Sequence, residues 1–368
     1  MTAPGRPRVL YVLFNYPTLS ETYIQAELEQ VARDFDVLVV GGRPSEVWND
    51  DPFPFVVEAD PDAVVEIAQD FRPDVLHSHW LDPVPVTAHV ARRTGVPFTV
   101  RTHGFDVQWT GRRERLFRLP LPTGWAAPER VRTPAALLRD DLCLGAICFP
   151  WARRTLRKLG VPDRKLRDCF PVVDIARFLD RGPNGDGVMY GGPVLPSKEI
   201  GNVLELARIT PAQRFDVYGI NDVGGRLAQR NEALGRPVTL HPHVQHHEMP
   251  AAYKQHEWYV KVPGLDNRGI GWPVSVAEAQ ASGVGVCMTR FRPDLADLLG
   301  GAGFLVESLA EARDVITKPY PAELRELGFD VAQRSDVRDH LHVLTDLWAP
   351  ALAERGGSTV TPPRAAPA

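Results

Sequence analysis

Apolar runs rich in β-branched residues alternate along this chain with segments of helical periodicity. The first such run covers residues 8–14, and residues 21–33 follow with apolar side chains at helical spacing. Further strands are predicted at 36–40, 75–77 and 97–101, and helices at 63–71 and 86–93. Short strands that alternate with helices predict a parallel sheet covered by helices on both faces.

The same alternation begins again after residue 186. Strands are predicted at 187–191, 214–218, 238–241, 258–262 and 285–288, and helices at 201–209, 249–255 and 274–281. The segment 180–187 is rich in Gly, Pro and Asp and is a natural linker. The chain therefore contains two α/β units of similar size.

These two units set the expected domain organisation. The 368 residues suffice for two ordinary domains. We expect a Rossmann-like domain at 1–180, a second at 181–340, a helix at 341–355 that packs back on the first domain, and a disordered tail at 356–368. Two facing α/β domains place a ligand in the cleft between them, at the carboxyl ends of the strands. Neither G-x-G-x-x-G nor G-x-x-x-x-G-K-[ST] occurs, which disfavours dehydrogenase and NTPase functions.

Charge and hydropathy exclude several other classes. The formal net charge is −4, so a broad nucleic-acid surface is not expected. No apolar stretch approaches the roughly 20 residues that span a bilayer, and no signal-peptide pattern is visible. The four cysteines form no C-x-x-C pair and are expected to be free thiols in a reducing compartment, so we expect a cytoplasmic protein. The basic residues Arg153, Arg154, Arg157 and Lys158 are either a solvated helix face or a contact to anionic lipid.

The string PTLSETYIQAE, residues 17–27, follows the first predicted strand. Ser20 or Thr18 is expected to cap the helix that starts near Glu21. The free N–H groups at that helix start would also favour an anion.

Two histidine-containing strings follow, DVLHSHW at 74–80 and RTHGFDV at 101–107. His77 and His79 are two residues apart, so one side of a strand end can carry both. A metal site needs a third ligand, and none has a clear spacing, so no metal is predicted. His103 is either a hydrogen-bonded histidine at a strand end or a cleft residue. Asp106 is expected to hold His103 or a helix start.

These three strings resemble signatures of the family 4 glycosyltransferases, written P-x-L-S-E-T-F-I-x-x-E, D-x-x-H-x-H and T-H-G-x-D. In that family the histidine of the third signature lies beside the sugar. The resemblance therefore implies His103 as the catalytic-site residue. It also implies that Ser20, Glu21, His79 and Asp106 belong to the acceptor side of the cleft.

Residues 191–201, GGPVLPSKEIG, are similar to the family string V-G-R-L-x-x-x-K-G. There the Arg and the Lys hold the diphosphate of the donor. Lys198 matches the Lys, and an ammonium supplies the point charge that a diphosphate needs. Pro193 stands at the Arg, so half of this clamp is missing from the motif.

Residues 271–286, GWPVSVAEAQASGVGV, resemble the family string E-G-F-G-x-x-x-x-E-A-M-A-S-G-x-P-V-V. Glu278 matches the second Glu, which binds the ribose hydroxyls, and a carboxylate suits two vicinal hydroxyls. Gly271 and Trp272 fall in the donor loop, and Pro273 replaces its second Gly. Ile270 stands where the first Glu would contact the transferred sugar. Asp266 or Arg268 would substitute for it if the loop is shifted.

The segment 238–264 also resembles the family, and His243 and Val244 fall where relatives contact the nucleotide base. The cluster His241, His243, His246 and His247, with Glu248, invites a metal reading. Its spacing matches no standard ligand pattern, so the base-contact loop is preferred.

The resemblance runs from about Val9 to Val306 and implies a GT-B fold and a retaining, metal-independent transferase without a cofactor. Its substrates would be a nucleotide-diphosphate sugar, carrying a hexosyl or a deoxy or amino sugar, and an acceptor that is a natural product, a polysaccharide or a lipid-linked glycan. Pro193 and Ile270 leave three explanations open: an unusual donor, an ordinary donor held by other residues, or a degenerate protein that binds a sugar or a partner. A nucleotide-sugar epimerase of the same architecture is a further alternative.

Overall fold

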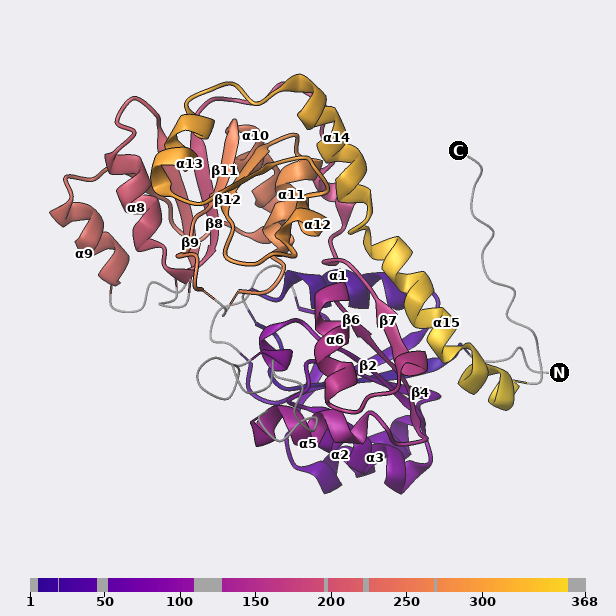
Figure 1. Cartoon of the computed structure of the whole chain (residues 1–368). Helices are drawn as coiled ribbons and strands as arrows, with labels where there is room; N and C mark the ends of the chain where they lie inside the picture. Colours follow the sequence, from indigo (N-terminus) through magenta and orange to yellow (C-terminus); the bar gives the residue numbers. More distant parts are fainter. Residues whose placement is uncertain are drawn as a thin grey trace.

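A computed structural model describes residues 6–18, 20–44, 52–108, 128–194, 198–220, 225–267 and 270–356. Two parallel sheets organise this part of the chain, each in its own α/β domain (Figure 1). The predicted strands and helices are confirmed, with ends that shift by no more than two residues except for the helix predicted at 341–355, which begins four residues earlier.

The first sheet has seven strands in the order β3-β2-β1-β4-β5-β6-β7, and all neighbours run parallel. The strands are β1 (Arg8–Leu13), β2 (Asp36–Gly41), β3 (Phe55–Val57), β4 (Val75–His79), β5 (Phe98–Arg101), β6 (Cys143–Cys148) and β7 (Leu166–Asp168). The α-helices are α1 (Thr22–Val31), α2 (Pro61–Phe71), α3 (Val84–Thr94), α5 (Glu129–Leu137), α6 (Pro150–Lys158) and α7 (Ile175–Phe178).

The second sheet has six parallel strands in the order β10-β9-β8-β11-β12-β13. The strands are β8 (Val188–Pro193), β9 (Phe215–Ile220), β10 (Thr239–Leu240), β11 (Trp258–Lys261), β12 (Gly285–Thr289) and β13 (Phe304–Val306). The α-helices are α8 (Gly201–Arg208), α9 (Arg226–Ala233), α10 (Met249–Lys254), α11 (Val274–Ala281), α12 (Leu295–Leu299), α13 (Leu309–Ile316) and α14 (Ala322–Gln333).

The last helix, α15 (Val337–Gly356), returns to the first domain. α14 packs on α11 in the second domain, whereas α15 packs on α1 and against β4 and β6 of the first (Figure 1). Trp348 is fully buried there, and its indole Nε1 donates to Thr99 Oγ1 at 2.9 Å. Among the described helices, none is both long enough and apolar enough to cross a membrane.

Apolar burial explains why the strands lie where the sequence pattern placed them. β4 and β12 are buried along their whole length, because helices cover both faces of each sheet. One buried cluster joins Val9 and Ile24 of the first domain to Ala279 and Trp348. The pattern missed β3, β7 and β13, which are only three residues long and too short to show a periodicity, and it also missed the six-residue strand β6.

The expectation for the start of α1 is wrong. Glu21, not Ser20 or Thr18, is the N-cap residue, and no side chain caps the helix. The Glu21 carbonyl oxygen accepts the N–H of Ile24 instead. A missing side-chain cap costs only about 1 kcal/mol, and here the chain before α1 follows the edge of the cleft described next.

Candidate functional site

A cavity of about 440 Å³ lies between the two domains. Its walls come from residues at the carboxyl ends of strands in both sheets, where ligands bind in open parallel sheets. The cavity has the size of a small-molecule site. Most predicted site residues line it: Ser20, Glu21, His103, Lys198, His243, Val244, Gly271, Trp272 and Glu278.

Two predicted residues, Asp106 and His79, lie behind the wall rather than in it. Asp106 Oδ1 accepts the backbone N–H groups of His103 at 3.0 Å and Gly104 at 2.8 Å. Its Oδ2 accepts the N–H of Leu81 at 3.1 Å. Asp106 therefore holds the loop that carries His103.

His79 is fully buried at the end of β4, and its Nδ1 lies 2.9 Å from Nε2 of His103. The His103 ring also packs against Tyr23 and Trp80, with ring centres 4.4 Å apart in each pair. Burial lowers the pKa of His103 well below its usual range, so this imidazole is neutral at pH 7.

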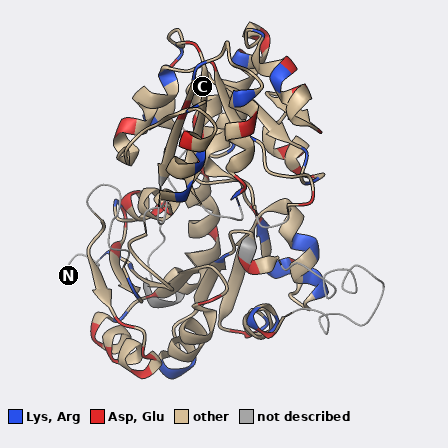
Figure 2. Ribbon diagram, turned by 90° about the vertical axis from the view of Figure 1, so that its left-hand side faces the viewer, with Lys and Arg blue, Asp and Glu red and all other residues tan. Residues whose placement is uncertain are grey.

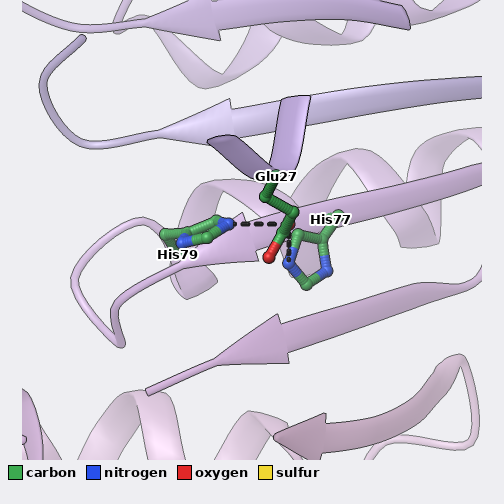
Figure 3. Close-up of side chains that lie close together, drawn as sticks. All are labelled: Glu27, His77 and His79. Carbon is green, nitrogen blue, oxygen red and sulfur yellow. Dashed lines mark hydrogen bonds and ion pairs between the residues drawn. The ribbon is translucent and has the colours of Figure 1, made fainter. Parts of the chain in front are cut away.

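Glu27 lies beside His77 and His79 and is the third potential metal ligand, which the spacing in the sequence did not reveal. In the described part of the chain, these three form the one group of potential metal ligands whose donor atoms lie within 4.8 Å of one another (Figure 3). Glu27 is the last residue of the PTLSETYIQAE string, so its type was visible but its position was not.

Ser20 and Glu21 form the edge of the cleft on the first domain. Burial raises the pKa of the Glu21 carboxyl to about 7. A carboxyl with this pKa is partly protonated near neutrality, so it can both donate and accept a hydrogen bond toward a bound hydroxyl.

Glu278 lies on α11 at the opposite wall. It is 7% exposed, and its Oε1 lies 3.1 Å from His246 Nε2, while its Oε2 accepts from the Tyr253 hydroxyl at 2.9 Å. Each oxygen of a carboxylate has two acceptor positions, so one on each remains for a ligand. The two protein contacts fix the direction in which the carboxylate faces.

Lys261 is a cleft residue that the sequence reasoning missed. It ends β11 and lines the cavity with Lys198, although its side chain is only 4% exposed. Burial, with a smaller contribution from the Lys198 ammonium, lowers the pKa of Lys261 to about 7. Neither ammonium has a hydrogen bond or ion pair to the described residues. A lysine at the end of an apolar strand run, WYVK, was the available signal.

Lys261 also occupies the neighbourhood of the missing arginine. Its Nζ lies 3.8 Å from where a Cβ on Gly192 would stand, next to Pro193, and 4.8 Å from the ring centre of Tyr190. A cation is therefore present at the end of β8 even though Pro193 carries none.

The four histidines of the predicted cluster, His241, His243, His246 and His247, do not converge on one site. His241 Nε2 lies 2.6 Å from Asp216 Oδ1, and His246 bonds Glu278. Both ring nitrogens of His243 are buried and have no described partner. Buried polar atoms in proteins are normally bonded, so the His243 ring calls for a ligand.

Ile270, Gly271 and Trp272 form the roof of the cavity. Ile270 is 2% exposed, and Trp272 is held by a 2.7 Å bond from its Nε1 to Asp294 Oδ2. Asp266, a candidate substitute at the Ile270 position, is not among the described residues that line the cavity. Arg268 lies outside the described residues.

Gly271 lies against the loop that carries His103, across the cleft. A Cβ there would stand 3.0 Å from the His103 carbonyl oxygen. We expect Gly271→Ala to displace the His103 loop by a few tenths of an ångström and to lower kcat/KM about tenfold, because small misplacements of reacting groups are costly. Gly328→Ala is the control, since its Cβ would meet nothing closer than 3.7 Å. Equal kcat/KM values for both variants and the wild type would contradict a functional contact.

The basic run lies on α6 and is partly neutralised. Arg153 binds Asp163 and Asp168, each at 3.0 Å, and Arg157 lies 3.6 Å from Asp163. Figure 2 shows basic and acidic residues mixed over both domains. This mixing favours the solvated-face alternative for the run.

Three solved structures show the same architecture over nearly the whole chain. HepE from Anabaena, in complex with UDP and glucose, has a TM-score of 0.71 and 13% identity, covering 94% of this chain and 100% of its own. Sucrose-phosphate synthase from Thermosynechococcus elongatus has a TM-score of 0.70 and 13% identity, with coverage of 95% and 100%. A glycosyltransferase from Rickettsia africae has a TM-score of 0.63 and 12% identity, with coverage of 93% and 99%.

The chain therefore has the GT-B fold of two facing Rossmann-like domains. No protein-family model matches it. No curated protein matches it in sequence. Likeness at such low identity establishes the fold, and function has to be argued from the site.

Proposed function

We propose that this protein transfers a sugar from a nucleotide-diphosphate donor to an acceptor in the cleft between its domains. The observation that carries the proposal is the pair Lys198 and Lys261, a half-buried and a buried lysine that line the cavity with His103 and have no counter-ion among the described residues. Buried cations without partners are costly, so their presence in a cavity calls for an anionic ligand. A diphosphate has the charge and the size that such a pair matches.

The rest of the second domain's wall fits the remainder of the donor. Glu278 receives the ribose hydroxyls, and His243 and Val244 contact the base. Gly271 and Trp272 cover the donor where α11 begins, and the first N–H groups of that helix favour a phosphate. The HepE structures contain UDP or UDP-glucose, which shows that this fold holds such donors in that protein.

The two departures from the family strings then have different meanings. Lys261 supplies a second cation in place of the arginine absent at Pro193, which supports an ordinary diphosphate held by other residues. Ile270 leaves an apolar surface where a carboxylate would bind a sugar hydroxyl. A deoxy sugar that lacks this hydroxyl therefore fits the cavity as well as a common hexose.

The acceptor enters from the first domain, along Ser20 and Glu21, and His103 lies beside the transferred sugar. By resemblance to the family we propose a retaining reaction in the cytoplasm without a metal or another cofactor. The acceptor classes are a natural product, a polysaccharide or a lipid-linked glycan, and α6 is the surface for any peripheral membrane contact. Domain closure would exclude water, which competes with the acceptor.

The test is a calorimetric screen of UDP, GDP, dTDP and ADP. One of them is expected to bind, and Glu278→Ala is expected to weaken it about 10- to 100-fold through lost hydrogen bonds to a charged group. Glu278→Gln keeps the shape of the side chain in case the alanine variant unfolds. Glu307→Ala, an exposed glutamate in the same domain, is the control.

Two results would contradict the proposal. Failure of all four nucleotides to bind at millimolar concentration would leave a degenerate protein. Conversion of the bound nucleotide sugar into an epimer without an acceptor would reveal an epimerase. Release of the nucleoside diphosphate only when an acceptor is present supports a transferase.

A further inference from the structure

A chain of buried hydrogen bonds runs from the cleft into the first domain. His103 Nε2 lies 2.9 Å from His79 Nδ1, and His79 Nε2 lies 3.0 Å from Glu27 Oε1 (Figure 3). Glu27 is 1% exposed, and its Oε2 lies 2.7 Å from Nε2 of His340 on α15. The chain therefore ends on a carboxylate that two imidazoles share.

Glu27 is ionised and can only accept hydrogen bonds. Burial alone would raise the pKa of Glu27, but His79 and His340 outweigh it and hold the pKa well below its usual range. The Tyr11 hydroxyl donates a further bond to Oε1 at 2.9 Å. Each imidazole nitrogen that faces Glu27 must therefore carry its proton.

His340 follows the same rule. Its Nε2 lies 2.7 Å from Glu27 Oε2, which can only accept, so the His340 proton sits on Nε2. NH1 of Arg101 lies 2.8 Å from both ring nitrogens of His340, and the bare Nδ1 is the one that can accept from it. Burial lowers the pKa of His340 to about 4, in agreement with a neutral ring.

The charges within this cluster sum to zero when no imidazole carries an extra proton. Glu27 carries one negative charge and Arg101 one positive charge, and both side chains are almost fully buried. A doubly protonated His79 would add an unpaired positive charge in the interior, which is costly. The charges therefore balance when His79 holds one proton, on Nε2 toward Glu27, and presents a bare Nδ1 to His103.

We propose that Glu27, acting through His79, is a positioning residue that holds His103 with its Nε2 protonated and its Nδ1 as a hydrogen-bond acceptor for a substrate hydroxyl. His79 Nδ1 can only accept, so His103 Nε2 must donate. No described residue bonds Nδ1 of His103, which leaves it to the cleft. The proposal rests on the proposed function for the identity of the substrate.

This arrangement would orient a sugar nucleotide that binds in the cleft. An acceptor nitrogen on the first domain repels phosphate oxygens and binds a hydroxyl, whereas Lys198 and Lys261 on the second domain attract the diphosphate. A sugar nucleotide can then lie in only one orientation, with a sugar hydroxyl on His103. The helix α15 takes part because His340 binds the second oxygen of Glu27.

The same residues admit a metal as the competing occupant. His77 Nε2 is buried, lies 3.4 Å from Glu27 Oε1 and has no hydrogen-bond partner. However, the hydrogen bonds of His77 can also be explained without a metal. The Thr99 hydroxyl accepts from Trp348 and can donate to His77 Nδ1, which lies 2.8 Å away, so that the His77 proton faces Glu27. The experiment below separates the two.

The test is ¹⁵N NMR of the labelled histidine side chains at pH 8, with His103 assigned by comparison with His103→Gln. Wild-type His103 is expected to show a protonated Nε2 and a bare Nδ1. In Glu27→Gln these two signals should move toward an averaged position, while Glu27→Asp should restore them. Tyr11→Phe, which removes another bond to Glu27 but keeps the His79 contact, should match the wild type.

A binding measurement distinguishes the loss of the His103 contact from a general loss of folded structure. In Glu27→Gln the nucleotide-sugar donor should bind about tenfold more weakly, and the nucleoside diphosphate should bind as in the wild type, because only the sugar contacts His103. A protonated Nδ1 in wild-type His103, an unchanged His103 spectrum in Glu27→Gln, or one retained metal ion per chain that is lost in His77→Gln would overturn the proposal. The spectrum decides even if no nucleotide binds, in which case only the proposed function fails.

Discussion

A variant that lacks both Lys198 and Lys261, each replaced by Met, is expected to bind the cognate nucleoside diphosphate at least about 100-fold more weakly than the wild type. Hydrogen bonds to charged groups contribute about 1.5–3 kcal/mol each, and about 1.4 kcal/mol corresponds to a factor of ten. The uncharged nucleoside should bind equally to both proteins. Calorimetry with the two ligands measures the difference.

The pH dependence of this binding follows from Lys261. Its pKa of about 7 in the free protein means that it is neutral above that pH, although a diphosphate requires the ammonium form. Binding must then take up a proton, so affinity should fall about tenfold for each pH unit from about pH 7.5 to 9. The single variant Lys261→Met should lose this slope, whereas Lys318→Met, at an exposed lysine of the same domain, should keep it. A wild-type affinity that does not change over this range would show that Lys261 does not contact the diphosphate.

Replacement of His340 by Leu is expected to lower the free energy of unfolding by about 3–5 kcal/mol at pH 7. The change leaves Glu27 Oε2 and the Arg101 guanidinium without their shared partner in the interior, and uncompensated buried charges carry costs of this size. It also frees α15 from α1 at that point. His342→Leu, an exposed residue on the same helix, should change the stability by no more than about 0.5 kcal/mol.

Acid should reduce the difference between the wild type and His340→Leu. The unfolded chain protonates His340 below its ordinary pKa of about 6.5, whereas the folded protein does so only below about 4. Between these values the unfolded state binds the extra proton, so the wild type loses up to about 1.4 kcal/mol per pH unit from this group. The variant has no such group. Urea unfolding at pH 7, 6 and 5 measures both curves, and parallel curves would contradict a neutral buried His340.

The predictions for the two lysines and for His340 concern the two walls of the cleft, which differ in charge. In the function we propose, the second domain supplies the cations and the first supplies groups that bind hydroxyls, with His103 in front and Glu27 behind it. This division explains why the chain tolerates Pro193. In the proposed function, Lys261 on the neighbouring strand β11 supplies the second positive charge at the diphosphate, as a point charge without the two-pronged hydrogen bonding of an arginine.

Local patterns were sufficient for most strands of the two sheets and for residues on both faces of the cleft. Period-two apolar runs and helical spacing are short-range properties, so they survive in a single sequence. Lys198, Glu278 and His103 stand in strings whose order along the chain also resembles a family, and the structure brings all three to one cavity. Asp106 was expected to hold His103, and it accepts the N–H of that residue.

The residues that contact these site residues could not be predicted from the sequence. Glu27 and His340 are 313 positions apart, and no spacing rule connects them. Lys261 was an ordinary residue of a predicted strand until the parallel pairing of β11 with β8 placed it beside Gly192. The sequence by itself determined which segments become strands and helices, because that depends on neighbours along the chain. Only the tertiary structure decided which charges are buried together, because that depends on how strands far apart in the sequence are ordered within a sheet and on where α15 returns.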